Sequence, residues 1–229
     1  MAGKKEVVAR LESQLDIAQE IRAKLAKDPK ALEWRKALRS WQAARLAKTH
    51  ADLLENKRYA KTASFFLTDI YGPKDVSQHI EGVRRLLPVM TKVLPESGLE
   101  TVADAVELDA LSEWLDSDMA AVLKDDVFDL DETKYVNAYC AVGRRADRER
   151  QIDLIEHLGR SLGRLTQNRL IGATLSMMRK PAVLAGVGEL QNFLERGHSA
   201  YRTMKGAKEF IEMITSRERA LMAAWFGAA

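Results

Sequence analysis

Cysteine, proline and long apolar runs are scarce in this chain of 229 residues. Each of these absences limits the kinds of protein that the chain can be. The single cysteine, Cys140, cannot form an internal disulfide, so we expect a reducing compartment, the cytoplasm. Five prolines leave long stretches free to form helices. No apolar run approaches the roughly 18 residues of a membrane span, and the start of the chain lacks the apolar segment of a signal peptide. We therefore predict a cytoplasmic protein without membrane contact.

Histidine is also scarce, which limits metal chemistry. The four histidines are His50, His79, His157 and His198. Di-iron helical bundles need two Glu-x-x-His pairs, and here only His198 has a glutamate, Glu195, three residues before it. We therefore predict no metal site and no cofactor.

Apolar residues recur at spacings of three and four, which is the helical pattern, and no segment alternates as a strand would. The expected helices cover 4–27, 29–71 with a break near Asn56, 77–94, 99–124, 148–167, a shorter one to 178, a long region from Pro181, and 216–226 with Ser216 as its N-cap. Asp28 and Pro29 suit the cap and first turn of the second helix. The pattern predicts an all-α fold, a bundle of about seven or more helices. We expect one domain, 1–229, with the alternative that 1–27 extends from it as an arm.

The net charge of +3 conceals a strong asymmetry. Residues 1–61 hold 15 Lys and Arg against 8 Asp and Glu, whereas residues 96–134 hold 2 against 13. Nucleic-acid modules more often show a basic face with interleaved aromatic residues. We therefore expect no nucleic-acid partner, and we expect the segments to neutralise one another in the fold or in a dimer.

The stretch FFLTDIYG at 65–72 places a carboxylate, Asp69, near the end of an apolar helix that stops at Gly72-Pro73. The helix macrodipole disfavours a negative charge there by roughly 0.3–1 kcal/mol. An acid in that place needs a cation or backbone donors, and Arg84, Arg85 or the free N–H groups of the next helix are the expected partners. We predict structural roles for Asp69, Gly72 and Pro73.

Two stretches resemble a bacterial family of uncharacterised helical proteins. They are the Phe-Phe-Leu-x-Asp-x-Tyr-Gly pattern at 65–72 and GHSAYRTMKGA at 197–207. The resemblance covers most of the chain from about residue 30. It implies an all-helical fold and no known activity, and it supplies no catalytic residues.

The pattern Gly-x-Ser-x-Gly at 159–163 matches the nucleophile turn of α/β-hydrolases. Here it lies inside a continuous helical stripe, and the strands of that fold are missing. Glycine costs about 1 kcal/mol relative to alanine in a helix, so a packing gain should offset it. We predict that Gly159 and Gly163 let another helix approach, and that Ser161 is not a nucleophile.

A polar stripe on the same predicted helix holds Asp153, His157, Arg160 and Arg164. The carboxylate could orient the histidine for proton transfer, and the arginines could hold an anion. The alternative is a solvated face with local ion pairs of a few tenths of a kcal/mol each.

The sequence shows no recognisable set of catalytic residues. We therefore expect a non-catalytic binding or interaction protein with an unidentified small-molecule ligand. The alternative is a haem-oxygenase-like enzyme or carrier, because one axial imidazole suffices for haem. Its pocket between helices would use His198, Tyr201 and Arg202. Trp225 and Phe226, almost at the chain end, need burial. We therefore expect a homodimer with the first or last helix at its interface.

Overall fold

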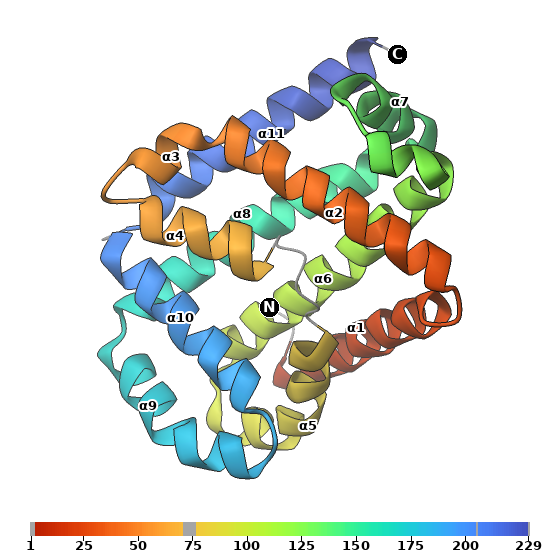
Figure 1. The fold of residues 1–229 in the computed structure, drawn as a ribbon. Helices are drawn as coiled ribbons and strands as arrows, with labels where there is room; N and C mark the ends of the chain where they lie inside the picture. The colour runs from red at the N-terminus through yellow and green to blue at the C-terminus, as the bar shows by residue number, and fades with distance from the viewer. Residues whose placement is uncertain (1–2, 71–76, 205, 229) are drawn as a thin grey trace.

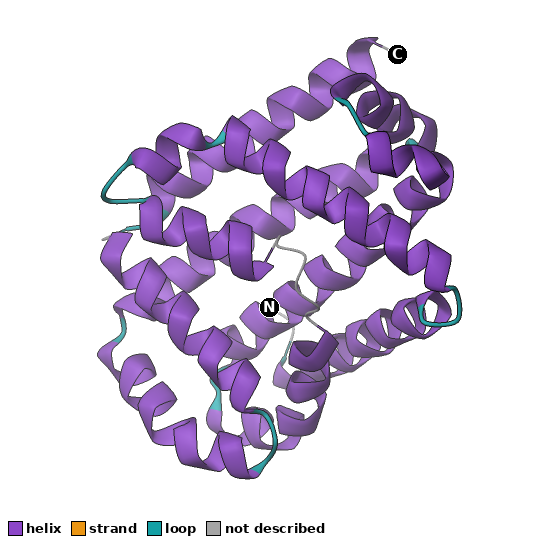
Figure 2. Cartoon of the chain, in the orientation of Figure 1, coloured by secondary structure: helices purple, strands orange, loops and turns teal. Residues whose placement is uncertain are grey.

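The protein is helical throughout the part of the chain that the structure describes. The structure is a computed structural model, and the residues it describes are 3–70, 77–204 and 206–228. Within these ranges there are eleven α-helices and no strand (Figure 2). The predicted all-α, multi-helix fold is confirmed.

The helices follow one another with short connections. In chain order they are α1 Lys4–Leu25, α2 Pro29–Thr49, α3 Ala51–Glu55, α4 Ala60–Phe65, α5 Ser77–Val93, α6 Glu96–Leu123, α7 Glu132–Val142, α8 Arg145–Gln167, α9 Arg169–Leu184, α10 Gly188–Met204 and α11 Lys208–Ala228. A π-helical turn, Phe66–Ile70, continues α4, and a 3₁₀ turn, Lys124–Asp129, follows α6.

The long helix α6 is the centre of the fold, with α1, α2 and α8 packed against it (Figure 1). Its buried residues lie on every side, and Leu99, Leu115 and Met119 are fully buried. A helix that buries residues all round belongs in the interior of a protein. The helix α1 lies along α6 and buries Leu11 and Leu15 completely, so it is part of the packed bundle.

Acidic side chains of α6 are paired with arginines from the helices around it. The pairs with α1 and α2 are Arg10–Asp104, Arg10–Glu107, Arg22–Asp109, Arg22–Glu113, Arg35–Glu113 and Arg39–Glu113. The side chains of Asp104 and Glu113 are only 4% and 5% exposed. Burial raises the pKa of Asp109, which the charge of Arg22 opposes. The basic start and the acidic middle of the sequence therefore neutralise one another within the fold.

Helix α8 approaches the start of α11 closely at two glycines. A Cβ atom on Gly159 would overlap the side chain of Ile211, and one on Gly163 would lie 2.8 Å from the Cβ of Ala207. Larger side chains at either position would force the two helices apart. The serine between them, Ser161, is buried inside α8.

The predicted helix limits hold in part. Asp28 caps α2, accepting a hydrogen bond from the Ala31 N–H at 3.0 Å, and a break occurs at Asn56. Two predicted starts are wrong. Pro181 lies inside α9, on an exposed face where water can satisfy the carbonyl that the missing N–H leaves free. Ser216 lies in the middle of α11, because that helix continues along a packed face.

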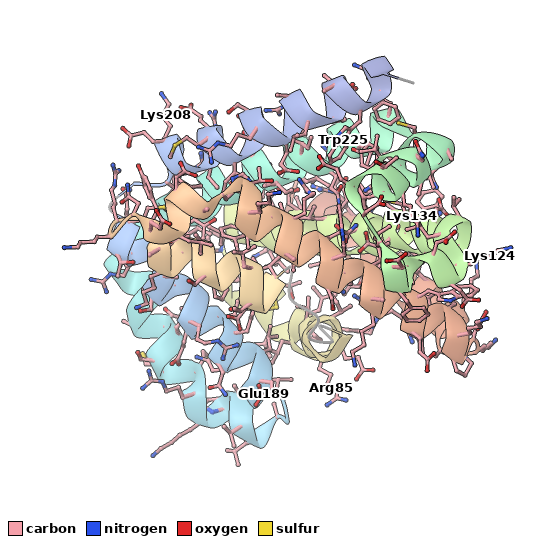
Figure 3. All side chains as sticks on the ribbon, turned by 45° about the horizontal axis from the view of Figure 1, so that its top comes forward. Arg85, Lys124, Lys134, Glu189, Lys208 and Trp225 are labelled. Atoms are coloured by element: carbon pink, nitrogen blue, oxygen red, sulfur yellow. The ribbon has the colours of Figure 1, made fainter. Side chains whose placement is uncertain are left out.

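The aromatic residues at the end of α11 pack within their own chain. The ring of Trp225 lies 4.9 Å from that of Tyr139 and 5.6 Å from that of Tyr135, both on α7. Phe226 lies 5.3 Å from Tyr139, and Figure 3 shows Trp225 between α11 and α7. These contacts leave both aromatic side chains half-buried within a single chain.

None of the described helices combines the length and apolar character that crossing a bilayer requires.

Candidate functional site

A cavity lies where α8, α9 and α10 meet, at the side of the molecule where α9 and α10 run next to each other (Figure 1). This inner cavity has a volume of about 380 Å³. Its lining residues are Gly163, Thr166, Gln167, Asn168, Gly172, His198, Tyr201, Arg202, Gly206 and Ala207. The volume falls in the range of small-molecule sites, roughly 300–1,000 Å³.

A wider outer groove of about 690 Å³ adjoins the inner cavity along α9 and α10. The two hollows share Gly172, His198 and Arg202. We call them together the His198 cleft. Helix α10 supplies half of its polar side chains, and α9 forms the opposite wall.

His198 sits at the centre of the cleft. Neither of its ring nitrogens makes a hydrogen bond within the described residues, and Nε2 is buried against Gly172, whose Cβ would lie 3.5 Å away. Burial lowers the pKa of His198, and the nearby charge of Arg202 lowers it further. The imidazole is therefore held neutral near pH 7, able to donate one hydrogen bond and to accept another.

The other two predicted residues of α10 also line the inner cavity. Arg202 is exposed, and it makes no ion pair within the part of the chain that the structure describes. Tyr201 is buried, with its ring 6.0 Å from that of Phe66. The structure thus brings His198, Tyr201 and Arg202 together at one cavity.

Glu195, which precedes His198 by three residues, is engaged elsewhere. Its carboxylate accepts hydrogen bonds from Nε and Nη2 of Arg179 on α9, at 2.7 and 2.8 Å. Gln191 donates to Glu195 at 2.7 Å and to the Leu175 carbonyl at 2.6 Å. These bonds fasten α9 to α10, and those from Arg179 and Gln191 lower the pKa of Glu195. No cluster of three His, Cys, Asp or Glu side chains suited to a metal ion occurs among the described residues.

The opposite face of α10 is fixed by α4. The ring of Phe65 occupies the space beside Gly197, where a Cβ would lie 3.0 Å from Cζ. Thr62 donates a hydrogen bond to the Ala200 carbonyl at 3.0 Å. The FFLTD and GHSAY stretches therefore pack against each other, and this contact positions the helix that carries His198.

Asp69 has a different partner from those expected. Its carboxylate accepts from Nε and Nη2 of Arg196 on α10, at 3.1 and 2.6 Å. Arg84 instead pairs with Asp16, and Arg85 with Glu81. The prediction of Arg84 or Arg85 was wrong because it assumed a neighbour in sequence, whereas the π-helical turn directs Asp69 towards α10.

Gly72 and Pro73, for which structural roles were predicted, lie outside the described residues. The free N–H groups proposed as the other partner of Asp69 lie at the start of the next helix, partly in the same undescribed range.

The polar stripe of α8 is divided among neighbouring helices. Asp153 and His157 do not pair with each other: Asp153 accepts from Arg219 on α11 at 2.7 Å, and Nδ1 of His157 lies 2.8 Å from Asp104 on α6. Arg160 pairs with Glu156 and Glu212, while Arg164 donates to Ser161 Oγ at 3.0 Å. None of the four lines the His198 cleft.

The sequence did not predict the part of the cleft that is formed by α9 and by the connection between α8 and α9. Gly172, Arg179 and Asn168 line the cleft but carry no motif or periodic signal. An isolated glycine in a helical segment was the one available sign, because it often marks a close approach.

Comparison with known proteins places the chain in a family. No curated protein and no solved structure matches it. Residues 21–229 match the family described as "Domain of unknown function (DUF8198)". That description carries no activity, as the resemblance to an uncharacterised family implied. The chain belongs to this family of proteins of unknown function.

Proposed function

We propose that this protein binds a small molecule in the His198 cleft and catalyses no reaction. The observation that carries the proposal is that His198, Tyr201 and Arg202 line one cavity of about 380 Å³. Polar groups that converge on a pocket of this size are typical of ligand sites.

The absence of acid–base partners in the cleft supports binding over catalysis. The described lining residues of the inner cavity include no carboxylate, and Glu195 in the outer groove is paired with Arg179. A general base or nucleophile needs a second group that orients or activates it. His198 has no such partner within the described residues.

The haem-oxygenase-like alternative has one favourable observation, the buried Nε2 of His198 without a hydrogen bond. Against it, Gly172 covers that nitrogen, and the inner cavity is lined mainly by small and polar residues. A porphyrin would need broad apolar walls. Haem titration would decide: the alternative requires an absorbance change that His198→Ala abolishes.

We also propose that the protein acts in a bacterial cytoplasm as a homodimer, with α9 at its interface in place of the first or last helix expected from the sequence. The single cysteine supports a reducing compartment. Exposed apolar side chains on α9 support a second copy: Met177, Val183 and Leu184 are 78%, 68% and 89% exposed. Such side chains are costly to leave in water when they cluster.

Native mass spectrometry of the protein purified from its own host tests the binding proposal. We expect a retained small molecule in the wild type and its loss in Gly172→Leu, because a side chain there would enter the cavity beside His198. Gly227→Leu is the matched control, since a Cβ on Gly227 meets nothing within 4 Å. A molecule retained equally by both variants, or by none of the three proteins, would contradict the proposal.

A further inference from the structure

We infer that the ligand of the His198 cleft carries an oxyanion, a carboxylate or a phosphate group, which Arg202 binds. This inference rests on the proposed binding function and adds the chemical class of the ligand. It depends on the charge balance of the cleft, on the geometry of the Arg202 guanidinium and on the state of His198.

The described side chains that line the cleft have a net positive charge. Arg202 is the single charged side chain among the described lining residues of the inner cavity. The outer groove adds Arg179 and Glu195, which neutralise each other through two hydrogen bonds. The described side chains of the cleft therefore carry one uncompensated positive charge. A cationic ligand would be repelled, whereas an oxyanion would gain a charged partner.

The helix ends at the cavity do not change this balance. Gln167 ends α8 and Asn168 precedes α9, while Met204 ends α10 and Ala207 precedes α11. Helix carboxyl ends carry partial negative charge and amino ends partial positive charge. Two ends of each kind meet at this corner, so their fields oppose each other. Among the described side chains that line the cavity, the sign of the local potential is therefore set by Arg202.

The geometry of arginine suits an oxyanion. Its planar guanidinium presents parallel N–H donors that match the two oxygens of a carboxylate or phosphate. Arg202 is exposed and makes no ion pair within the described residues, so these donors are available to a ligand. The other arginine among the described lining residues, Arg179, is already paired with the carboxylate of Glu195.

His198 provides a neutral polar neighbour. Arg202 lies near enough to oppose protonation of the imidazole. A bound oxyanion would cancel that repulsion, and the ring would then accept a proton more readily. His198 therefore reports on binding at Arg202 without having to form part of the anion contact itself.

Two-dimensional NMR of the histidine side chains in the full chain tests the inference. Inorganic phosphate and acetate are the two probes, His198→Gln assigns the signal, and sodium chloride controls for ionic strength. We expect one probe or both to shift the His198 signal saturably and to raise its pKa. Arg202→Gln should weaken that probe at least about tenfold, as expected when a charge-assisted hydrogen bond is lost. The probe that binds more tightly identifies the headgroup class.

Arg145→Gln is the matched control, because Arg145 is an exposed arginine paired with Glu149 away from the cleft. It should bind like the wild type. Circular dichroism confirms that both variants fold. No shift of His198 with either probe, or equal binding by Arg202→Gln, would overturn the inference. A neutral molecule retained in the cleft by native mass spectrometry would overturn it too, while leaving the binding proposal intact.

Discussion

Asp69, in the FFLTDIYG stretch, is paired with Arg196, which directly precedes the GHSAYRTMKGA stretch and lies 127 residues further along the chain. The Asp69 carboxylate accepts two hydrogen bonds from the guanidinium and a third, at 3.0 Å, from the hydroxyl of Thr68. Arg196 lies two residues before His198 on α10. The ion pair therefore holds the helix of the cleft from the side opposite to α9, which gives Asp69 an architectural role.

Replacing Asp69 by alanine should lower the free energy of unfolding by about 1 kcal/mol, as for one charge-assisted hydrogen-bonded pair. The side chain of Asp69 is 10% exposed and that of Arg196 47%, so the arginine left behind can be hydrated. Urea denaturation of Asp69→Ala, Arg196→Ala and the double variant gives the coupling energy. An unchanged stability together with lost ligand binding would reassign Asp69 to the site.

Gly159→Ala should destabilise the protein by about 1–3 kcal/mol, because the new methyl group would overlap Ile211. Gly227→Ala is the matched control within a helix. Its Cβ meets nothing within 4 Å, so the substitution should be neutral or stabilising by up to about 1 kcal/mol. Thermal melts of both variants check the pair. Equal effects would mean that α8 and α11 are not closely packed at Gly159.

The contrast between these residues shows what sequence alone could predict. Local signals gave the helical class, the Asp28 cap and the close glycines of α8, because each depends on a few neighbouring residues. The Asp69–Arg196 pair, the Arg179–Glu195 pair and the Gly172 wall depend on which helices meet. Those contacts arise from tertiary packing, which the single sequence does not encode locally. His198, Tyr201 and Arg202 could be predicted to share one face from the sequence alone, because they lie within about one turn of the same helix.

Stability should fall in acid partly through Glu218. Burial would raise its pKa, but the hydrogen bond to His50 and the charge of Arg45 lower it below the ordinary value. Because the folded pKa lies below the unfolded value of about 4.3, this stabilisation is complete above that pH and is lost as pH falls through the folded pKa.

Glu218→Gln should therefore differ most from the wild type near pH 6 and least near pH 3. Urea denaturation across this range measures the difference. Glu189→Gln is the control, at an exposed carboxylate that has no ion pair among the described residues. A difference for Glu218→Gln that does not change with pH would contradict the assignment.

Ser161 should not react with a fluorophosphonate probe. Its side chain is buried within α8, and its hydroxyl oxygen accepts a hydrogen bond from Arg164. Gel-based labelling of the folded protein checks this expectation, with Ser161→Ala beside it. Labelling that disappears in the variant would restore the nucleophile hypothesis.

The proposed homodimer should depend on the apolar face of α9. Sedimentation equilibrium at micromolar concentration should detect a species of twice 25.7 kDa. Leu184→Glu should weaken it, since Leu184 is 89% exposed in the single chain. Ile17→Glu, at a side chain 41% exposed on α1, tests the first helix as the alternative interface and should leave the dimer intact. A mass of 25.7 kDa at every concentration would exclude the dimer.

The most direct test of the binding account is a high-resolution crystal structure of the protein purified from its own host without added ligand. We predict non-protein density in the inner cavity, with an oxyanion in contact with the Arg202 guanidinium and next to the ring of His198. Density for water alone in the cleft, with a retained molecule bound elsewhere on the chain, would contradict it.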